Sequence, residues 1–494
     1  MADQADNPLD AAALYAMGYA LLAEGRPAQA VAMLSAAAES GYNATVLNDL
    51  ASALILSGQA HEAEQRLREA IELEPSLFHP LFNLGGLLLS RGSGEALGWL
   101  RLAYAADPAG PDVVPAMVSA LLAEGNAAYG AGRLIEAETL YREAIAMQPQ
   151  SSGGFANLGN ALAGQLRTEE AVAAYQSALA LAPWDDTAGF AYGLCLLRNG
   201  RDHEGWAEFE RRRSVPALRH NYLRHPHLPQ WQSGLSLAGR RVLVTAEQGY
   251  GDLIQYARFV PALARVAAGV VLEVPWTLAG IFDDLPGVGR QIGLGEPAAD
   301  CDIACPLLSL PLLLGTEAGI APPYVTPSPP RVGRWANWLD RSRFARRVGL
   351  VCSGDPRHPL DQARSIPLAD FAPVLAVPGV SFVLVQTEIR ASDRPAFDAF
   401  DDLRCPAAAL TDYADTAALL SGLDLLISVD TSAAHLAGAM GLPIWTLLPF
   451  CPDYRWKLGS DDTAWYPSMR LYRQQRPGDW ETVIRRVRDD LARL

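Results

Sequence analysis

The fold is decided by the stretch LDLLISVDTSAAHLAGAMGLPIWTLLP, residues 423–449. Leu425–Val429 is a short apolar run typical of a buried strand, and Asp430–Ser432 supplies residue types that cap helices. Ala433–Met440 is rich in helix formers, and Gly441 with the proline two residues later ends the helix before a second apolar run. We therefore predict a strand, a tight turn, a short helix and a second strand.

This unit predicts an anion site at the start of its helix. The first N–H groups of a helix have no partner within the helix and carry the positive end of its dipole. Just beyond the carboxyl end of a parallel strand, such groups commonly bind phosphate. The small residues Ser432, Ala433 and Ala434 would let a diphosphate approach the backbone, and His435 could contact a phosphate or sugar oxygen. An ordinary strand–helix turn with a capping side chain is the alternative.

The composition indicates a globular protein. Of the 494 residues, 50% are hydrophobic and 19% are charged, and the length suffices for about two to four domains. The formal net charge of -15 argues against a nucleic-acid surface, although it is compatible with a local basic pocket. The start of the chain lacks the pattern of a signal peptide, and no uncharged apolar run reaches the ~20 residues of a membrane span. We therefore expect a cytoplasmic protein without a membrane span.

The cysteines do not predict a zinc site. Cys301 and Cys305 are the only close pair among the six, and neither a second pair nor a histidine accompanies them at ligand spacing. We expect reduced, buried thiols.

Small residues recur at a regular spacing in the first two hundred residues. They lie at Ala30, Ala63, Ala96, Ala137, Ala171 and Gly205, with steps of 33, 33, 41, 34 and 34, the longest step containing the insertion DPAGPDVVPAMV. This pattern resembles the tetratricopeptide repeat, whose period is 34 residues and whose small residues let two antiparallel helices pack closely. We predict an α-solenoid of about six such repeats in residues 1–213.

A solenoid of this kind has a concave groove that typically holds an extended or helical peptide. We therefore expect an acceptor protein or peptide in the repeat groove, with dimerisation or plain spacing as the alternative role. Residues 214–239 lose the periodicity and are predicted to be a linker packed on the next domain. Their histidines, His220, His225 and His227, are not expected to bind a metal because no carboxylate or cysteine stands beside them.

The second half of the chain alternates apolar runs with helical segments. The predicted strands lie at 242–245, 270–274, 348–352, 382–385, 425–429 and 444–448. Such alternation predicts parallel sheets with helices on both faces. The proline-rich stretch 321–331 is the predicted hinge between two Rossmann-like lobes, 240–330 and 331–494, which enclose a cleft.

A glycine loop, EQGYGD at 247–252, follows the first of these strands. It lacks the third glycine of a dinucleotide-binding fingerprint, and the expected acidic residue does not follow. The loop does place Asp252 in the first turn of a helix, where Gly249 and Gly251 would admit a ligand closely. The alternative is that Asp252 only caps this helix.

A basic loop follows the predicted strand at 348–352. Arg357, His358 and Arg364 lie beyond its end, on the same side of the sheet as the turn at Asp430–His435. Arginine can neutralise a diphosphate bidentately. A solvated loop is the alternative.

Three separate segments resemble bacterial heptosyltransferase-type glycosyltransferases of family 9. They are GDLIQYARFVPAL from Gly251, ARSIPLADF from Ala363 and SVDTSAAHLAGAMGLP from Ser428. The tail segment PFCPDYRW, from Pro449, resembles the subset in which such a domain follows tetratricopeptide repeats.

The resemblance implies a GT-B fold and an inverting transferase that uses a nucleotide sugar and no metal. Matched position by position, Asp252 becomes the candidate general base that deprotonates the acceptor hydroxyl. The candidate donor-binding residues are Gly249, Gly251, Arg364, Ser365, Asp430, Thr431, Ser432, Ala433 and His435. The helix start and the cations would stabilise the leaving diphosphate in place of a divalent metal.

We therefore predict a glycosyltransferase that moves a sugar to a Ser or Thr of a protein captured by the repeats, such as a flagellin. The segment 240–330 is short for a lobe with a full acceptor pocket, which suggests that the repeats take over acceptor recognition. One alternative is a transferase acting on lipopolysaccharide core or another glycan. A second alternative is a repeat scaffold whose transferase-like domain is inactive.

Overall fold

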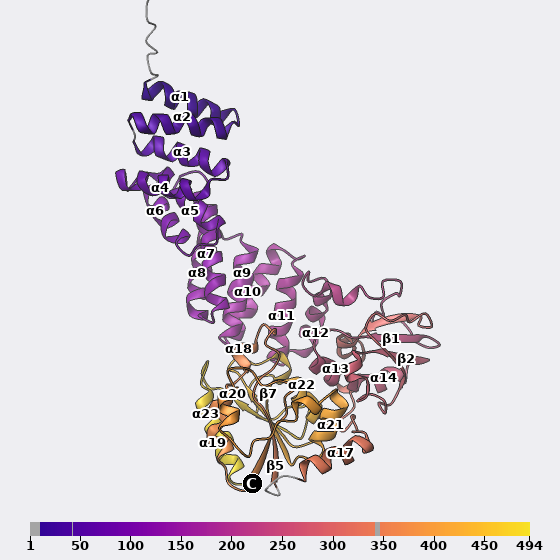
Figure 1. Cartoon of the computed structure of the whole chain (residues 1–494). Coiled ribbons are helices and arrows are strands. Elements are labelled where there is room, and N and C mark those ends of the chain that lie inside the picture. The colour runs from indigo at the N-terminus through magenta and orange to yellow at the C-terminus, as the bar shows by residue number, and fades with distance from the viewer. Residues whose placement is uncertain (1–9, 42, 341–345) are drawn as a thin grey trace, which may run out of the picture. The chain divides into compact units, whose positions relative to one another are not determined.

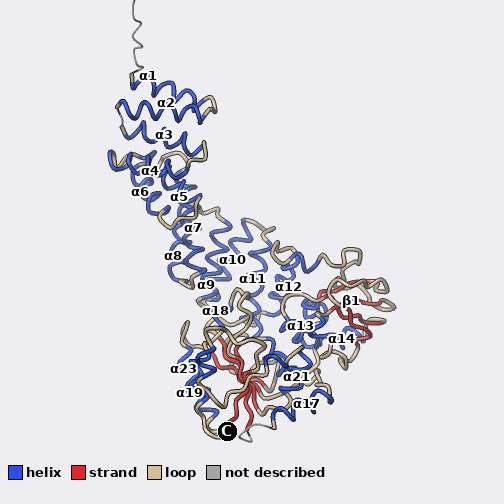
Figure 2. The backbone as a smooth tube through the Cα atoms, viewed as in Figure 1, coloured by secondary structure: helices blue, strands red, loops and turns tan. Residues whose placement is uncertain are grey.

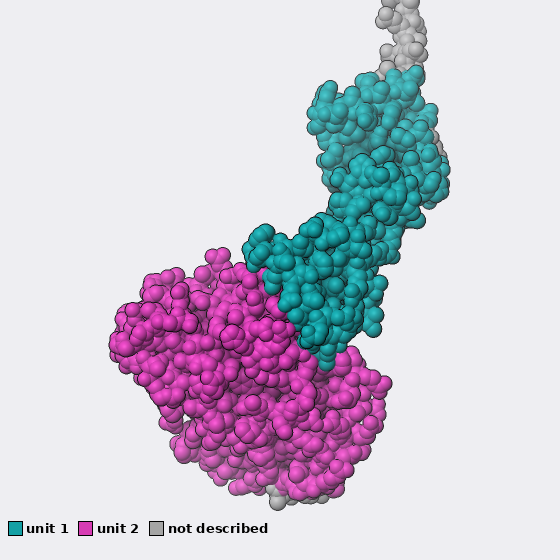
Figure 3. Space-filling view, turned by 180° about the vertical axis from the view of Figure 1, so that it is seen from behind, with its two compact units in different colours: residues 1–184 teal, residues 185–494 magenta. Residues whose placement is uncertain are grey.

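The computed structural model describes residues 10–41, 43–340 and 346–494. They form two compact units, the first ending at Trp184 and the second running from Asp185 to Leu494 (Figure 3). Among the described residues, every helix is too short or too polar to cross a membrane.

The first unit is a stack of helices joined by short turns (Figure 1). The helices are α1 (Ala11–Ala23), α2 (Pro27–Ser40), α3 (Ala44–Leu56), α4 (Ala60–Leu73), α5 (Phe78–Ser90), α6 (Ala96–Ala106), α7 (Val113–Gly130), α8 (Leu134–Met147), α9 (Ser152–Gly164) and α10 (Thr168–Leu181). The insertion noted in the sequence lengthens α7, which has 18 residues where α5 and α9 have 13.

Small residues stand where paired helices touch. A Cβ at Gly85 would lie 2.6 Å from Leu100, and a Cβ at Gly125 would lie 2.5 Å from Tyr141. Real atoms do not approach this closely in a packed interior, so these crossings need glycine. Gly205, the last small residue of the predicted series, meets the same limit, because a Cβ there would lie 2.7 Å from Leu197.

Most turns between paired helices use a glycine in the left-handed region, as Gly132 does with φ 75°. The turn between α9 and α10 is the exception. Leu166 occupies the left-handed position there with φ 60°, a conformation that a side chain with a Cβ disfavours.

The second unit begins with a helix pair, α11 (Asp186–Arg198) and α12 (Asp202–Phe209), followed by the short 3-10 helix η1 (Glu210–Arg213). Trp206 and Phe209 of α12 belong to the same hydrophobic core as Val244 and Ile254 of the following α/β region. The last helix pair of the repeat pattern is therefore packed into the second unit.

The first α/β lobe contains a parallel sheet with the strand order β3-β2-β1-β4 among the described residues. Its strands are β1 (Arg241–Thr245), β2 (Gly269–Glu273), β3 (Val288–Ile292) and β4 (Ile303–Pro306), and its helices are α13 (Tyr250–Tyr256), α14 (Val260–Ala264), α15 (Trp276–Ala279) and α16 (Leu310–Leu314). The stretch 214–239 runs along this sheet, and the Trp231 N–H donates to the Ala304 carbonyl oxygen at 2.8 Å.

The second lobe contains a parallel sheet with the order β6-β5-β7-β8-β9, drawn in red in Figure 2. Its strands are β5 (Arg346–Val351), β6 (Val380–Leu384), β7 (Leu425–Val429), β8 (Ile444–Leu448) and β9 (Met469–Arg473). Its helices are α17 (Pro329–Leu339), α18 (Asp361–Arg364), α19 (Ala372–Leu375), α20 (Arg394–Asp398), α21 (Tyr413–Leu420), α22 (Ser432–Ala439) and α23 (Trp480–Leu491).

The predicted fold class, an α-solenoid followed by two Rossmann-like α/β lobes, is confirmed. Strands β7 and β8 have the predicted ends, and α13 begins two residues before the predicted Asp252. Strands β3, β4 and β9 were not predicted, and each lies at a sheet edge. Polar and charged residues interrupt β3 and β9, so neither forms an apolar run, and β4 has only four residues.

Candidate functional site

The candidate site is centred on the point where the second sheet reverses its strand order, between β5 and β7. In open α/β sheets the loops on the two sides of such a point run in opposite directions, and ligands commonly bind in the crevice between them at the carboxyl ends of the strands. The loop after β5 contributes Arg364 and the turn after β7 contributes Asp430. The Arg364 Nη1 atom donates to the Asp430 carbonyl oxygen at 3.0 Å. The structure thus brings together two of the predicted donor-binding residues.

Helix α22 begins in this crevice without a side-chain cap. Thr431 is the residue before its first turn, and no side chain caps the helix among the described residues, so the predicted cap is wrong. Instead, the Thr431 hydroxyl lies 3.2 Å from that of Ser428, and the Ser432 hydroxyl lies 2.5 Å from that of Tyr413. Because the polar side chains are engaged elsewhere, the N–H groups of Ser432 and Ala433 remain available to an anion.

His435 lies one turn into α22 and is buried. Its ring stacks on Trp456 with a centroid separation of 5.1 Å, and its Nδ1 atom lies 3.1 Å from the Tyr466 hydroxyl. Burial, with the nearby Arg364 charge, lowers the pKa of His435 to about 3. The imidazole is therefore neutral at pH 7. It can donate one hydrogen bond and accept another, but it does not supply a positive charge.

Asp430 faces the same aromatic group. Its Oδ2 atom accepts a hydrogen bond from the Trp456 indole N–H at 2.8 Å, and its Oδ1 atom lies 3.8 Å from His435 Nε2. Burial raises the pKa of Asp430. Since His435 is neutral, this contact is not an ion pair, and Asp430 is held chiefly by Trp456.

The loop between β5 and α18 is braced by its own side chains. Ser365, a predicted donor-binding residue, accepts from the Gly354 N–H at 3.2 Å and donates to Asp361 at 2.7 Å. The exposed Arg357 pairs with Asp355 of its own loop at 2.8 Å. Burial lowers the pKa of His358, with the Arg364 charge as a second cause. Of the three predicted basic residues, Arg364 is therefore the one whose guanidinium reaches the turn after β7.

Helix α13 of the first lobe packs against α22, and its first turn supplies the opposite wall of the site. Gly251 lies directly on His435, since a Cβ there would come within 2.7 Å of the imidazole Cδ2 atom. Gly249 precedes the helix, and its N–H donates to Asp252 Oδ2 at 2.9 Å. Asp252 thus has the capping role that the sequence left open, and its other oxygen points to the second lobe.

That second oxygen forms an ion pair with Arg455, which lies 203 positions later in the chain. The side chains of Arg455 and Asp252 are 10% and 12% exposed. Arg455 also contacts Asp453 Oδ1 through Nη1 at 2.6 Å, so two carboxylates share one guanidinium. Burial, with the nearby Asp430 charge, raises the pKa of Asp453 to about 7, whereas burial lowers the pKa of Arg455 to about 10. Arg455 therefore remains a cation at neutral pH.

Sequence reasoning missed the roles of Asp453, Arg455 and Trp456. All three lie in the segment PFCPDYRW, which was noted for its resemblance but was given no function. Its juxtaposed proline, acid, base and aromatic residues were the available signal, because such chemistry directly after a buried strand seldom serves packing alone.

Two guanidinium groups at this site are incompletely paired. The Nε atoms of Arg364 and Arg455 are buried and lack a hydrogen-bond partner among the described residues. A buried N–H without an acceptor costs about 1–3 kcal/mol. An oxyanion in the crevice would relieve this cost.

Across residues 10–41, 43–340 and 346–494, the structure contains no group of three or more His, Cys, Asp or Glu residues suited to holding a metal. Metal-independent chemistry stays a prediction that rests on the cations and on the start of α22.

In the first unit, amide side chains pair between successive repeats. Asn83 Nδ2 donates to Asn48 Oδ1 at 2.9 Å, and Asn157 Nδ2 donates to Asn126 Oδ1 at 3.0 Å. A separate cavity of about 460 Å³ lies among α6, α7 and α8. Occupation of the repeat groove by an acceptor stays a prediction.

The comparisons with known proteins identify the solenoid. Family models described as tetratricopeptide repeat match residues 21–82, 122–184 and 156–213. The solenoid consists of tetratricopeptide repeats. YrrB, described as a TPR protein with an unusual peptide-binding site, is similar to 37% of this chain and 92% of that chain at 19% identity, with a TM-score of 0.32.

Two further similarities extend beyond the tetratricopeptide repeats. Protein FlbA of Caulobacter vibrioides is 29% identical over 341 residues, which cover 60% of this chain and about half, 54%, of that protein. A family 9 glycosyl transferase from Veillonella parvula is 11% identical, with 52% of this chain and 92% of that chain covered and a TM-score of 0.37.

Proposed function

We propose that this protein is a glycosyltransferase that moves a sugar from a nucleotide sugar to a Ser or Thr of a protein bound by its repeats. The proposal rests on one observation: two elements, one from each lobe, face each other. An uncapped helix start with Arg364 lies on one side, and Asp252 of α13 lies on the other.

The donor side suits a diphosphate. The free N–H groups at the start of α22 and the Arg364 guanidinium converge at the β5–β7 crevice. Both favour negative charge and would stabilise a nucleoside diphosphate as it leaves. The three matching sequence segments contribute residues to these same elements, which supports the assignment.

The acceptor side suits a hydroxyl group. In an inverting transfer, the acceptor oxygen forms a bond to the anomeric carbon while the bond from that carbon to the diphosphate breaks. The acceptor proton must go to a base within hydrogen-bond reach. Asp252 is the candidate, held by the Gly249 N–H and by Arg455.

The test is a panel of nucleotide sugars incubated with the protein and a bacterial cell extract, with mass spectrometry of products. We expect one donor to be consumed and a protein to gain the mass of one sugar. Asp252→Asn should lower kcat about 100-fold or more while the donor KM stays within about twofold.

Asp284→Asn, an exposed carboxylate of the same lobe, is the matched control and should keep wild-type kinetics. An Asp252→Asn variant with wild-type kcat would refute Asp252 as the base. Labelling of a glycolipid instead of a protein would show that the acceptor is a glycan.

One observation favours a second candidate, a repeat scaffold with an inactive transferase-like domain. Both Asp252 oxygens are engaged, one by the Gly249 N–H and the other by the largely covered Arg455. If calorimetry detected no binding of nucleoside diphosphates or nucleotide sugars, the scaffold would replace the enzyme.

A further inference from the structure

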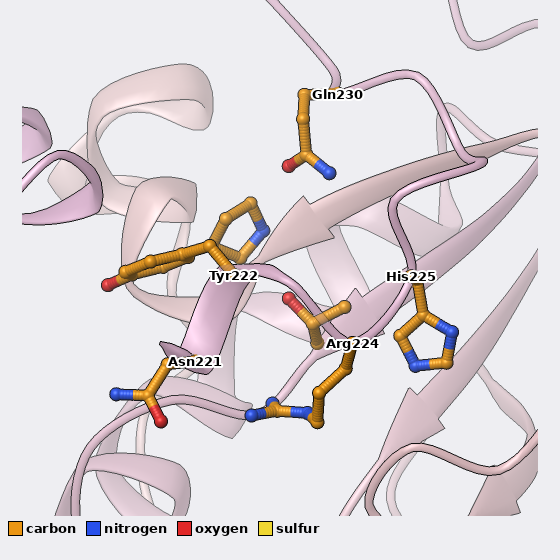
Figure 4. A pocket seen from close by; sticks show the side chains of 7 residues that line it. Asn221, Tyr222, Arg224, His225 and Gln230 are labelled. Atoms are coloured by element: carbon orange, nitrogen blue, oxygen red, sulfur yellow. The ribbon is translucent and has the colours of Figure 1, made fainter. Parts of the chain in front are cut away.

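In the first lobe, the point where the strand order reverses is closed. It lies between β1 and β4, where Thr245 and Pro306 are register partners at the strand ends. Open sheets usually bind a ligand at this position. Here side chains of the segment 221–230 leave a cavity of only about 10 Å³, enough for about one water molecule (Figure 4). This space is too small for a sugar or a nucleotide.

A buried ion pair lies beside the closed crevice. Glu247 follows β1, and Arg212 lies in η1, directly after the helix pair of the last repeat; both side chains are 0% exposed. The guanidinium binds the carboxylate bidentately, Nε to Oε2 at 2.9 Å and Nη2 to Oε1 at 3.0 Å. Oε1 also accepts from the Leu308 N–H at 2.8 Å, and Oε2 accepts from the Tyr222 hydroxyl. The carboxylate thus accepts four hydrogen bonds from three groups.

Arg212 is itself fixed on every side. It donates to Ser309 Oγ at 2.9 Å and to Glu210 Oε1 at 2.5 Å, and it stacks over Phe209 at 4.5 Å. A bidentate, fully buried pair of this kind has one geometry, since any shift would leave a charge without its partner.

Glu247 begins the loop that carries Asp252. The next residue, Gln248, adopts φ 59° although it is not glycine. Such a conformation persists only where the surroundings enforce it. Gly249 follows, and its N–H donates to the Asp252 carboxylate. An anchor at Glu247 therefore sets the path of the backbone up to the first turn of α13.

We propose that Arg212 is a positioning residue: through Glu247 it fixes the glycine loop and so orients Asp252, which makes the last repeat part of the transfer site. This inference rests on the proposed transferase function. It accounts for the packing of α11 and α12 into the second unit.

The variants separate positioning from folding. Replacing Arg212 alone would leave a buried carboxylate unpaired and could unfold the lobe. Arg212→Met/Glu247→Gln removes both charges and keeps an acceptor for the Leu308 N–H. Arg212→Lys keeps the charge but loses the bidentate geometry. Asp202→Asn is the matched control, because Asp202 ties the same repeat to Lys457 at 2.7 Å and does not contact the glycine loop.

Two readouts test the proposal on the full chain. In the double variant, hydrogen–deuterium exchange of amides 249–253 should accelerate at least about tenfold, while amides 432–439 exchange as in the wild type. With the donor found in the nucleotide-sugar panel, kcat should fall about 10- to 100-fold and the donor KM should change less than about twofold. In Arg212→Lys, the decrease in log kcat should be at least about a third of the decrease in the double variant. Asp202→Asn should leave kcat unchanged.

Unchanged exchange at 249–253, or an unchanged kcat, would overturn the proposal; if the double variant did not fold, Arg212→Lys would decide by the same criteria. A parallel fall in donor affinity would also overturn it, since Arg212 would then act through overall stability. If the wild type used no donor at all, the transferase function would fail, and the exchange result would still decide whether Arg212 fixes the loop.

Discussion

Because His435 is neutral in the native state, the free energy of unfolding of the second unit should depend on pH. The substitution His435→Gln should remove this contribution. Burial lowers the pKa of His435 from 6.5 to about 3. Below pH 6.5 the unfolded chain binds a proton that the native state does not bind, so this contribution to stability is present above pH 6.5 and is lost as the pH falls toward 3.

The size of the effect follows from the two pKa values. Between about pH 7.5 and about pH 5.0, protonation of the His435 ring in the unfolded state should by itself lower the free energy of unfolding of the wild type by about 2 kcal/mol. Protonation of Asp453, whose pKa in the native state is raised to about 7, acts in the opposite direction and is common to the wild type and the variant. His435→Gln keeps a polar group that can reach the Tyr466 hydroxyl but does not titrate. Its free energy of unfolding should therefore fall by about 2 kcal/mol less than that of the wild type over this pH range.

The measurement is urea unfolding at both pH values, followed by tryptophan fluorescence, because Trp456 stacks on His435. Exposed His61 supplies the matched control, and His61→Gln should keep the wild-type difference between the two pH values. If wild type and His435→Gln lost the same free energy between the two pH values, His435 would not be neutral in the native state, and the account of the site would fail.

Three further substitutions have definite expected outcomes. Gly251→Ala should lower the free energy of unfolding by about 1–3 kcal/mol in urea, because the added methyl group would meet His435 at 2.7 Å; no loss would contradict the packing of α13 on α22. Arg455→Gln should lower kcat at least about tenfold in the donor assay, because Asp252 loses its orienting partner; a rate equal to that of the wild type would show that the ion pair is not needed. Leu166→Gly should raise the stability of the first unit by about 0.5–1 kcal/mol, measured by circular dichroism during urea unfolding, because φ 60° suits glycine; a loss would mean that the leucine side chain contributes more than the backbone conformation costs.

The sequence predicted what depends on neighbours along the chain. The repeats could be recognised because each is a pair of helices of about 34 residues that needs small residues at fixed positions. The unit from β7 to β8 was equally visible, because a buried strand, a short helix and a second strand each have a local pattern. Asp252, Arg364 and His435 could be selected because each follows a predicted strand at its carboxyl end.

Tertiary structure decided how these residues are used. Asp252 was predicted as a base, but its ion pair with Arg455 joins segments 203 positions apart, and no local pattern encodes such a pair. The neutrality of His435 depends on burial, which comes from packing against Trp456 and Gly251. Likewise, only the folded chain reveals that Arg212 of the last repeat lies against Glu247. Interactions between residues close in the sequence determine where helices and strands form. Burial and charge pairing depend on contacts between distant segments, which exist only in the folded lobes.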